Sequence, residues 1–203
     1  MPGCRNLYRV VAIAASAVAL SAASAHAQAP APPIAPQGDD VGYLQFAAVA
    51  ERVNLTYLRE LRSARWLTGA ERAVVARAIA AKRETTMALE MALGADAPQP
   101  GDFVAVFPQG ALKHRRAGLQ RGTRLQRLIV QTLVGGAPFV ADAGTRVLLT
   151  RVVSADSTQL SLWHRLSGDE TVGGLPTSVD LQTAGDLLDR YLTQPSAPQR
   201  EDL

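Results

Sequence analysis

The sequence has 203 residues, one cysteine and a formal net charge of +3, and 47% of its residues are hydrophobic. This length is enough for one domain with a substantial hydrophobic core. A single cysteine excludes an intramolecular disulfide framework, and no Ser-His-Asp, Cys-His, phosphate-loop or dinucleotide signature is present.

The first 27 residues have the pattern of a secretory signal peptide. Arg5 and Arg9 flank the start of a short apolar stretch, and Ala25-His26-Ala27 fits a signal-peptidase site. A membrane anchor would need a longer apolar run without interrupting serines. We therefore expect cleavage before Gln28 and a periplasmic or secreted protein. The remaining 176 residues contain no cysteine and carry 19 basic against 18 acidic residues, so we expect no nucleic-acid partner.

Residues 28–39 read as an Ala/Pro-rich linker, and helical periodicity begins after them. Thr68-Gly-Ala-Glu71 predicts a capping box that starts a second helix, and Gly94 ends that helix. Asp142 predicts the start of a fourth helix, which Gly168 ends. The predicted long helices cover about residues 40–66, 69–93, 111–134 and 143–166. A short fifth helix is expected at about 183–192, followed by a disordered tail at 193–203.

The lengths of the connections predict the topology. Short connections make the first and second helices antiparallel, and likewise the third and fourth. The connection from Gly94 to Gly110 is long enough to span a helix when extended, which allows the second and third helices to run parallel. The sequence therefore predicts an all-α domain over residues 40–192. Its form is a four-helix bundle with one long crossover, as in ferritin-like folds, plus a short C-terminal helix.

Four stretches resemble the bacterial exported ferritin-like domain family, which also contains desiccation-related proteins. They are YLQFAAVAERVNLTYL (43–58), RETTMALEMALGADAPQPGDF (83–103), LQRLIVQTLVGGAP (125–138) and DSTQLSLWHRL (156–166). The segment GLPTSVDLQ resembles the proline-then-aspartate tail that follows the bundle in this family. The resemblance implies a ferritin-like bundle with a di-metal site, built from a glutamate on each of two helices and Glu-x-x-His on the other two.

Several of the implied ligands are missing from this chain. The resemblance places metal-binding carboxylates at Glu51, Glu84 and Asp156. The other ligand positions hold Asn54, Met87, Gln126 and Gln159, none of which supplies an imidazole. His114 and His164 lie away from the expected site, so we interpret both as surface or structural residues.

Two interpretations of the site follow. In the first, Glu51, Glu84 and Asp156 are enclosed in the bundle and form a metal-free network with the amides. In the second, they retain one oxygen-seeking cation such as Ca²⁺ or Mn²⁺. The first predicts a non-catalytic structural, stress-related or binding protein of the envelope, without a cofactor. The alternative is a metal-binding oxidase or iron-handling protein that uses these three carboxylates.

The third predicted helix begins in a basic run, made of Lys113, Arg115, Arg116, Arg121, Arg124 and Arg127. This run could form a patch for an acidic envelope component or partner. The alternative, which we favour, is a solvated helix face whose charge is balanced by acids elsewhere in the protein. The sequence also leaves open a homo-oligomer.

Overall fold

The computed structural model describes residues 40–99, 101–108, 110–168 and 176–193. The predicted signal peptide (1–27), the linker (28–39) and residues 194–203 of the predicted tail lie outside the described residues. The prediction of an all-α protein is confirmed, because helices dominate the described chain. None of the helices in the described ranges is long and apolar enough to cross a membrane.

Four long helices and one short helix make up most of the structure. The long helices are α1 (Asp40–Arg62), α2 (Gly69–Leu93), α3 (Arg115–Gly136) and α4 (Ala143–Ser167). The short helix is α5 (Leu181–Leu188), and three 3₁₀ turns lie at η1 (Gly94–Asp96), η2 (Ala137–Phe139) and η3 (Asp189–Tyr191). Two short strands, β1 (Val104–Ala105) and β2 (Leu192–Thr193), pair antiparallel.

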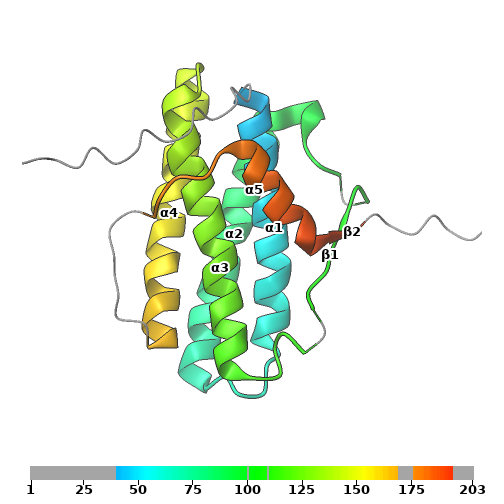
Figure 1. Cartoon of the computed structure of the whole chain (residues 1–203), viewed down its shortest axis with the longest axis vertical. Helices are drawn as coiled ribbons and strands as arrows, with labels where there is room; N and C mark the ends of the chain where they lie inside the picture. The colour runs from blue at the N-terminus through cyan, green and yellow to red at the C-terminus, as the bar shows by residue number, and fades with distance from the viewer. Residues whose placement is uncertain (1–39, 100, 109, 169–175, 194–203) are drawn as a thin grey trace, which may run out of the picture. The chain divides into compact units, whose positions relative to one another are not determined.

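The four long helices lie side by side (Figure 1). Helix α1 packs closely on α2 and also contacts α3, whereas α4 packs closely on α3 and less on α2. In the view of Figure 1, α1 descends and α2 rises, the described parts of the segment between α2 and α3 return along one side, and then α3 rises and α4 descends. Helices α2 and α3 therefore rise in the same direction in this view.

The predicted ends of α2 and α4 agree with the structure. Thr68 Oγ1 accepts a hydrogen bond from Glu71 N at 3.2 Å, and the Glu71 carboxylate accepts one from Thr68 N at 2.8 Å. This reciprocal pair is the predicted capping box of α2. Asp142 caps α4 through a 2.7 Å hydrogen bond from Thr145 N. Gly168 ends α4 with a positive φ of 71°, which glycine adopts without strain.

Other predicted boundaries were wrong by a few residues. Helix α1 ends at Arg62 rather than Trp66, because the chain turns there through 3₁₀-type hydrogen bonds such as Ala64 N to Leu61 O. Helix α5 begins at Leu181 and not at Thr183. The preceding residue, Asp180, caps the helix, since its carboxylate accepts a 2.9 Å hydrogen bond from the Thr183 amide. Thr193 pairs in β2, so it belongs to the folded part and not to the tail.

The inner face of α2 shows how the core is built. Six of its seven buried residues follow one another at alternating spacings of four and three residues: Val75, Ile79, Lys82, Thr86, Leu89 and Leu93. That spacing keeps them on one side of the helix, facing the other helices. Four of the six are apolar and belong to the hydrophobic core. Lys82 and Thr86 interrupt this stripe with polar groups, and they mark the level of the candidate site.

Candidate functional site

Each of the four long helices contributes a buried polar side chain near its middle. These are Glu51 and Asn54 on α1, Lys82 on α2, Gln126 on α3 and Asp156 on α4, and each is at most 2% exposed. Burial of polar groups is unfavourable unless they find hydrogen-bonding partners. Their contacts therefore decide what the site can do.

Lys82 joins two carboxyl groups from different helices. Its Nζ donates a hydrogen bond to Glu51 Oε1 at 2.7 Å and a second one to Asp156 Oδ1. Both contacts are also buried salt bridges. One cation therefore links α2 to α1 and to α4. We call Glu51, Lys82 and Asp156 the buried triad.

The charges of the buried triad are coupled. Burial raises the pKa of Glu51 well above its usual range, and the neighbouring Asp156 raises it further, while Lys82 lowers it less. Burial alone would lower the pKa of Lys82, but the two carboxyls outweigh burial and raise that pKa. The raised pKa of Glu51 favours its protonated form, and the raised pKa of Lys82 favours its charged form.

Asn54 and Gln126 form a second buried contact. Asn54 Nδ2 donates to Gln126 Oε1 at 2.6 Å, which ties α1 to α3. The sequence-based interpretation had these amides donating to the carboxylates, but the structure pairs them with each other. Gln159 is only half-buried, and its Oε1 has no hydrogen-bond partner among the described residues.

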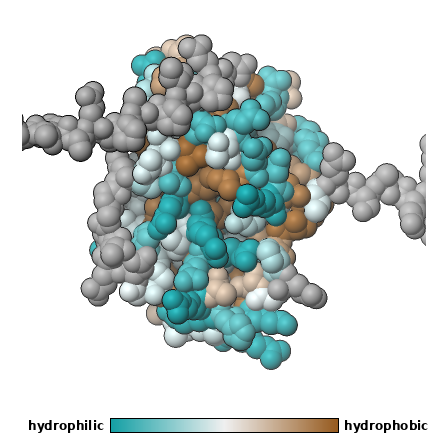
Figure 2. Space-filling view, in the orientation of Figure 1, coloured by the Kyte–Doolittle hydropathy of each residue, from teal (hydrophilic) through white to brown (hydrophobic). Residues whose placement is uncertain are grey.

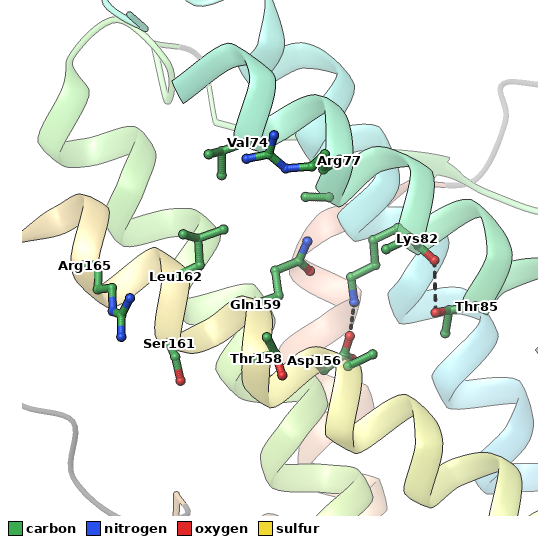
Figure 3. A pocket seen from close by; sticks show the side chains of 13 residues that line it. Val74, Arg77, Lys82, Thr85, Asp156, Thr158, Gln159, Ser161, Leu162 and Arg165 are labelled. Carbon is green, nitrogen blue, oxygen red and sulfur yellow. Dashed lines mark hydrogen bonds and ion pairs between the residues drawn. The ribbon is translucent and has the colours of Figure 1, made fainter. Parts of the chain in front are cut away.

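A groove between α2 and α4 reaches the buried triad. Its volume is about 420 Å³, and Lys82, Asp156 and Gln159 contribute to its lining. Figure 3 shows Lys82 pointing across from α2 to Asp156 on α4, with Arg77 and Arg165 away from this contact. The remaining lining side chains are mostly small or apolar: Val74, Ala78, Ala81, Thr85, Ala155, Thr158, Ser161 and Leu162.

The predicted placement of Glu84 and Met87 was wrong. The sequence analysis put both on the inner face of the second helix, but Glu84 is exposed and Met87 is 61% exposed. Glu84 is two residues beyond Lys82, which is about 200° around an α-helix. When Lys82 faces inward, Glu84 must face outward. The three carboxylates Glu51, Glu84 and Asp156 therefore do not meet.

Lys82 is not among the predicted site residues, although the sequence contains a signal that it is buried. Val75, Ile79, Leu89 and Leu93 define one apolar stripe, and position 82 lies within that stripe at heptad spacing. A lysine inside an apolar stripe requires a buried counter-charge. The prediction relied on the motif Glu84-x-x-Met87 instead, and so it placed the wrong face of the helix toward the core.

The residues present do not fit the di-metal centre that the resemblance implies. Among the residues that the structure describes, no group of three or more His, Asp or Glu side chains could hold a metal ion. The Lys82 ammonium lies within hydrogen-bonding distance of both remaining carboxyls. A divalent cation bound to these oxygens would have to displace it and then bear its repulsion.

The two predicted non-ligand histidines lie away from the buried triad. His114 is exposed at the start of α3. His164 is 8% exposed, and its Nε2 lies 3.4 Å from Arg127 Nη2. His164 is therefore a buried contact of α4 with α3.

The basic run of α3 does not form one uniform surface. Figure 2 shows a largely hydrophilic face over α3, and Lys113, Arg116 and Arg124 are exposed. Arg121 and Arg127 are half-buried. Arg115 is held by the Glu71 carboxylate, by the Leu166 carbonyl oxygen at 2.9 Å and by the Trp66 ring, whose centroid is 5.9 Å away. This arginine therefore links the start of α3 to α2, to α4 and to the segment between α1 and α2.

In comparisons with known proteins, no family model, no curated protein and no solved structure matches this chain. The geometry and charge of the buried side chains are therefore the basis for assigning a function.

Proposed function

We propose that this protein is an exported, non-catalytic helical bundle of ferritin-like topology, in which a lysine takes the place of a metal centre. Its role is that of a structural, stress-related or binding protein of the cell envelope. The resemblance of residues 43–166 and the course of the four long helices support the topology. The signal-peptide pattern supports export.

One observation supports the loss of metal chemistry most directly. The Lys82 ammonium lies 2.7 Å from Glu51 and also bonds to Asp156, so both carboxyls that the bundle encloses already have a cation. The buried triad therefore holds a cation without a metal ion. Lys82 also occupies one oxygen of each carboxyl, and a hard cation would require such oxygens as ligands. We infer that the polar centre now holds the helices together.

The alternative function, a metal-binding oxidase or iron-handling protein, has less support. It requires Glu51, Glu84 and Asp156 to act together, but Glu84 is exposed on the outer face of α2. Two carboxyls and no imidazole would have to hold the metal against the charge of Lys82. Such a set lacks the ligands that an oxygen-activating iron site uses.

Elemental analysis tests this proposal. Protein purified without chelators should contain far less than one equivalent of iron, manganese or zinc. It should also oxidise Fe(II) in air no faster than buffer does. The matched control is Glu51→Ala, which removes a carboxyl from the centre and should change neither result. Stoichiometric metal in the wild type that is lost in Glu51→Ala would overturn the proposal and favour the alternative function.

A further inference from the structure

The outer face of α2 carries a second regular pattern. Ala73, Arg77, Ala80, Glu84 and Met87 follow one another at spacings of four, three, four and three residues, and all are exposed. This is the spacing of residues that form the contact line between two packed helices. The inner stripe of α2 with the same spacing already faces the core. We call the exposed set the outer stripe.

The outer stripe has unpaired charges and exposed apolar groups. Met87 is 61% exposed and Met91, one turn further along, is 81% exposed. These are the two largest exposed fractions among the large apolar side chains that the structure describes. Arg77 and Glu84 form no ion pair with any described residue. Exposed apolar side chains on a regular helix face are typical of an interaction surface.

The order of residues along the outer stripe is self-complementary about Ala80. Arg77 precedes Ala80 by three residues, and Glu84 follows it by four. Ala73 and Met87 lie seven residues away on either side. When a second copy of α2 lies antiparallel across the first, Ala80 meets Ala80 of the other copy. Arg77 of each copy then faces Glu84 of the other copy, and Met87 of each copy covers Ala73 of the other copy.

We propose that two copies of this chain associate through the outer stripe of α2, in an antiparallel arrangement with a twofold axis at Ala80. A twofold interface requires one surface to complement itself, and the opposite charges at Arg77 and Glu84 meet that requirement. The alanine side chain at the axis allows the two helices to approach closely. A parallel pairing would instead place Arg77 against Arg77 and Glu84 against Glu84.

The groove beside α2 strengthens the charge match. Arg165 of α4 lines the same groove as Arg77 and, like Arg77, has no ion pair among the described residues. Glu84 of the second copy would therefore approach a region with two arginines (Figure 3). Attraction between unlike charges across an interface favours this arrangement over other pairings.

Charge exchange tests the dimer. Sedimentation equilibrium of the full chain, carrying Cys4→Ser to remove its only thiol, should show a monomer–dimer equilibrium. Arg77→Glu alone and Glu84→Arg alone each place like charges opposite one another twice, and each should weaken the dimer by about tenfold or more. The double variant Arg77→Glu/Glu84→Arg restores unlike pairs and should recover most of the affinity. The matched control is Arg124→Glu, at an exposed position of α3, which should not change the affinity of the dimer.

A cysteine at the proposed axis gives an independent measurement. Ala80→Cys in the Cys4→Ser background should form a covalent dimer under mild oxidation, whereas Lys113→Cys should form far less. Thermal unfolding checks that every variant folds, since these positions are exposed. A wild type that stays monomeric at high micromolar concentration would overturn the proposal. So would a dimer that neither charge reversal weakens.

Discussion

Glu51 and Lys82 form a buried ion pair between the first two helices, with 2.7 Å between Oε1 and Nζ and both side chains at most 3% exposed. The same lysine also binds Asp156 of α4. A buried cation between two carboxyls requires one shared proton to be neutral, because an extra buried charge is strongly unfavourable. The stability of the protein should therefore depend on the protonation state of Glu51.

Glu51→Gln should reduce the dependence of stability on pH. The pKa of Glu51 is raised in the folded protein, so its contribution is fully present below the unfolded pKa, near 4.5. That contribution is lost as the pH rises through the raised pKa of the folded state. Glutamine keeps a neutral group that can accept from Lys82 and donate to Asp156. Urea unfolding from pH 4 to 9 should show the variant gaining stability relative to the wild type as the pH rises. A constant difference across this range would contradict a raised pKa of Glu51 in the folded protein.

Lys82→Met should strongly destabilise the protein at neutral pH. It removes the counter-charge and leaves a buried carboxylate unpaired, which typically costs about 3–5 kcal/mol. The loss should become smaller as the pH falls, because protonation removes unpaired negative charge from the core. The free energy of unfolding in urea measures both effects, and the exposed Lys113→Met is the control, with an expected change within about 0.5 kcal/mol. If Lys82→Met matched the control at pH 7, the buried triad would not be what stabilises the core.

Lys82→Glu should convert the triad into a cation-binding site. Three carboxyls would then face one another inside the bundle, and oxygen ligands of this kind bind Mn²⁺ or Ca²⁺. We expect the variant to be unstable without metal and its Tm to rise with added Mn²⁺, because a ligand that binds only the folded state stabilises it. The wild type should show no such rise. Equal shifts in both proteins would mean that Lys82 does not exclude cations.

Gly136→Ala should destabilise the contact between α3 and α1. A Cβ at this position would overlap the ring of Tyr43, which is 1% exposed and cannot move into solvent. Overpacking of this kind costs about 1–3 kcal/mol. Gly185→Ala in α5 is the matched control, since nothing lies within 4 Å of its added Cβ. That control should be neutral or slightly stabilising in thermal unfolding, because alanine restricts the unfolded chain. Equal Tm values for the two variants would contradict the close approach.

The helical architecture could be predicted from local sequence signals. Thr68 and Glu71 form a capping box, and Asp142 and Gly168 bound α4, because these groups act on the backbone of their own turn. Such signals do not depend on the rest of the fold. The end of α1 at Arg62 could not be predicted in this way. It coincides with a contact distant in sequence, in which Trp66 Nε1 donates to Leu112 O at 2.8 Å.

The buried centre could be predicted only in part. Glu51, Asn54, Gln126 and Asp156 were identified as candidates, and all four are buried. The prediction failed on α2, because the motif Glu84-x-x-Met87 was given more weight than the apolar stripe. Which face of a helix is buried depends on its whole length, so the stripe gives the orientation where a four-residue motif does not. The partners of Lys82 lie on other helices and could not be found by spacing along the chain.

The pairing of β1 with β2 has a consequence for the order of folding. Val106 N donates to Tyr191 O at 2.8 Å, and Phe107 packs on Tyr191, so the end of the described chain fastens the segment between α2 and α3. These contacts join residues that are far apart in sequence, and such contacts form slowly. When the chain emerges N-terminus first, its four long helices can form before β1 pairs with β2. The segment between α2 and α3 is therefore held in place only when residues 191–193 are available, so this step can follow the formation of the four long helices.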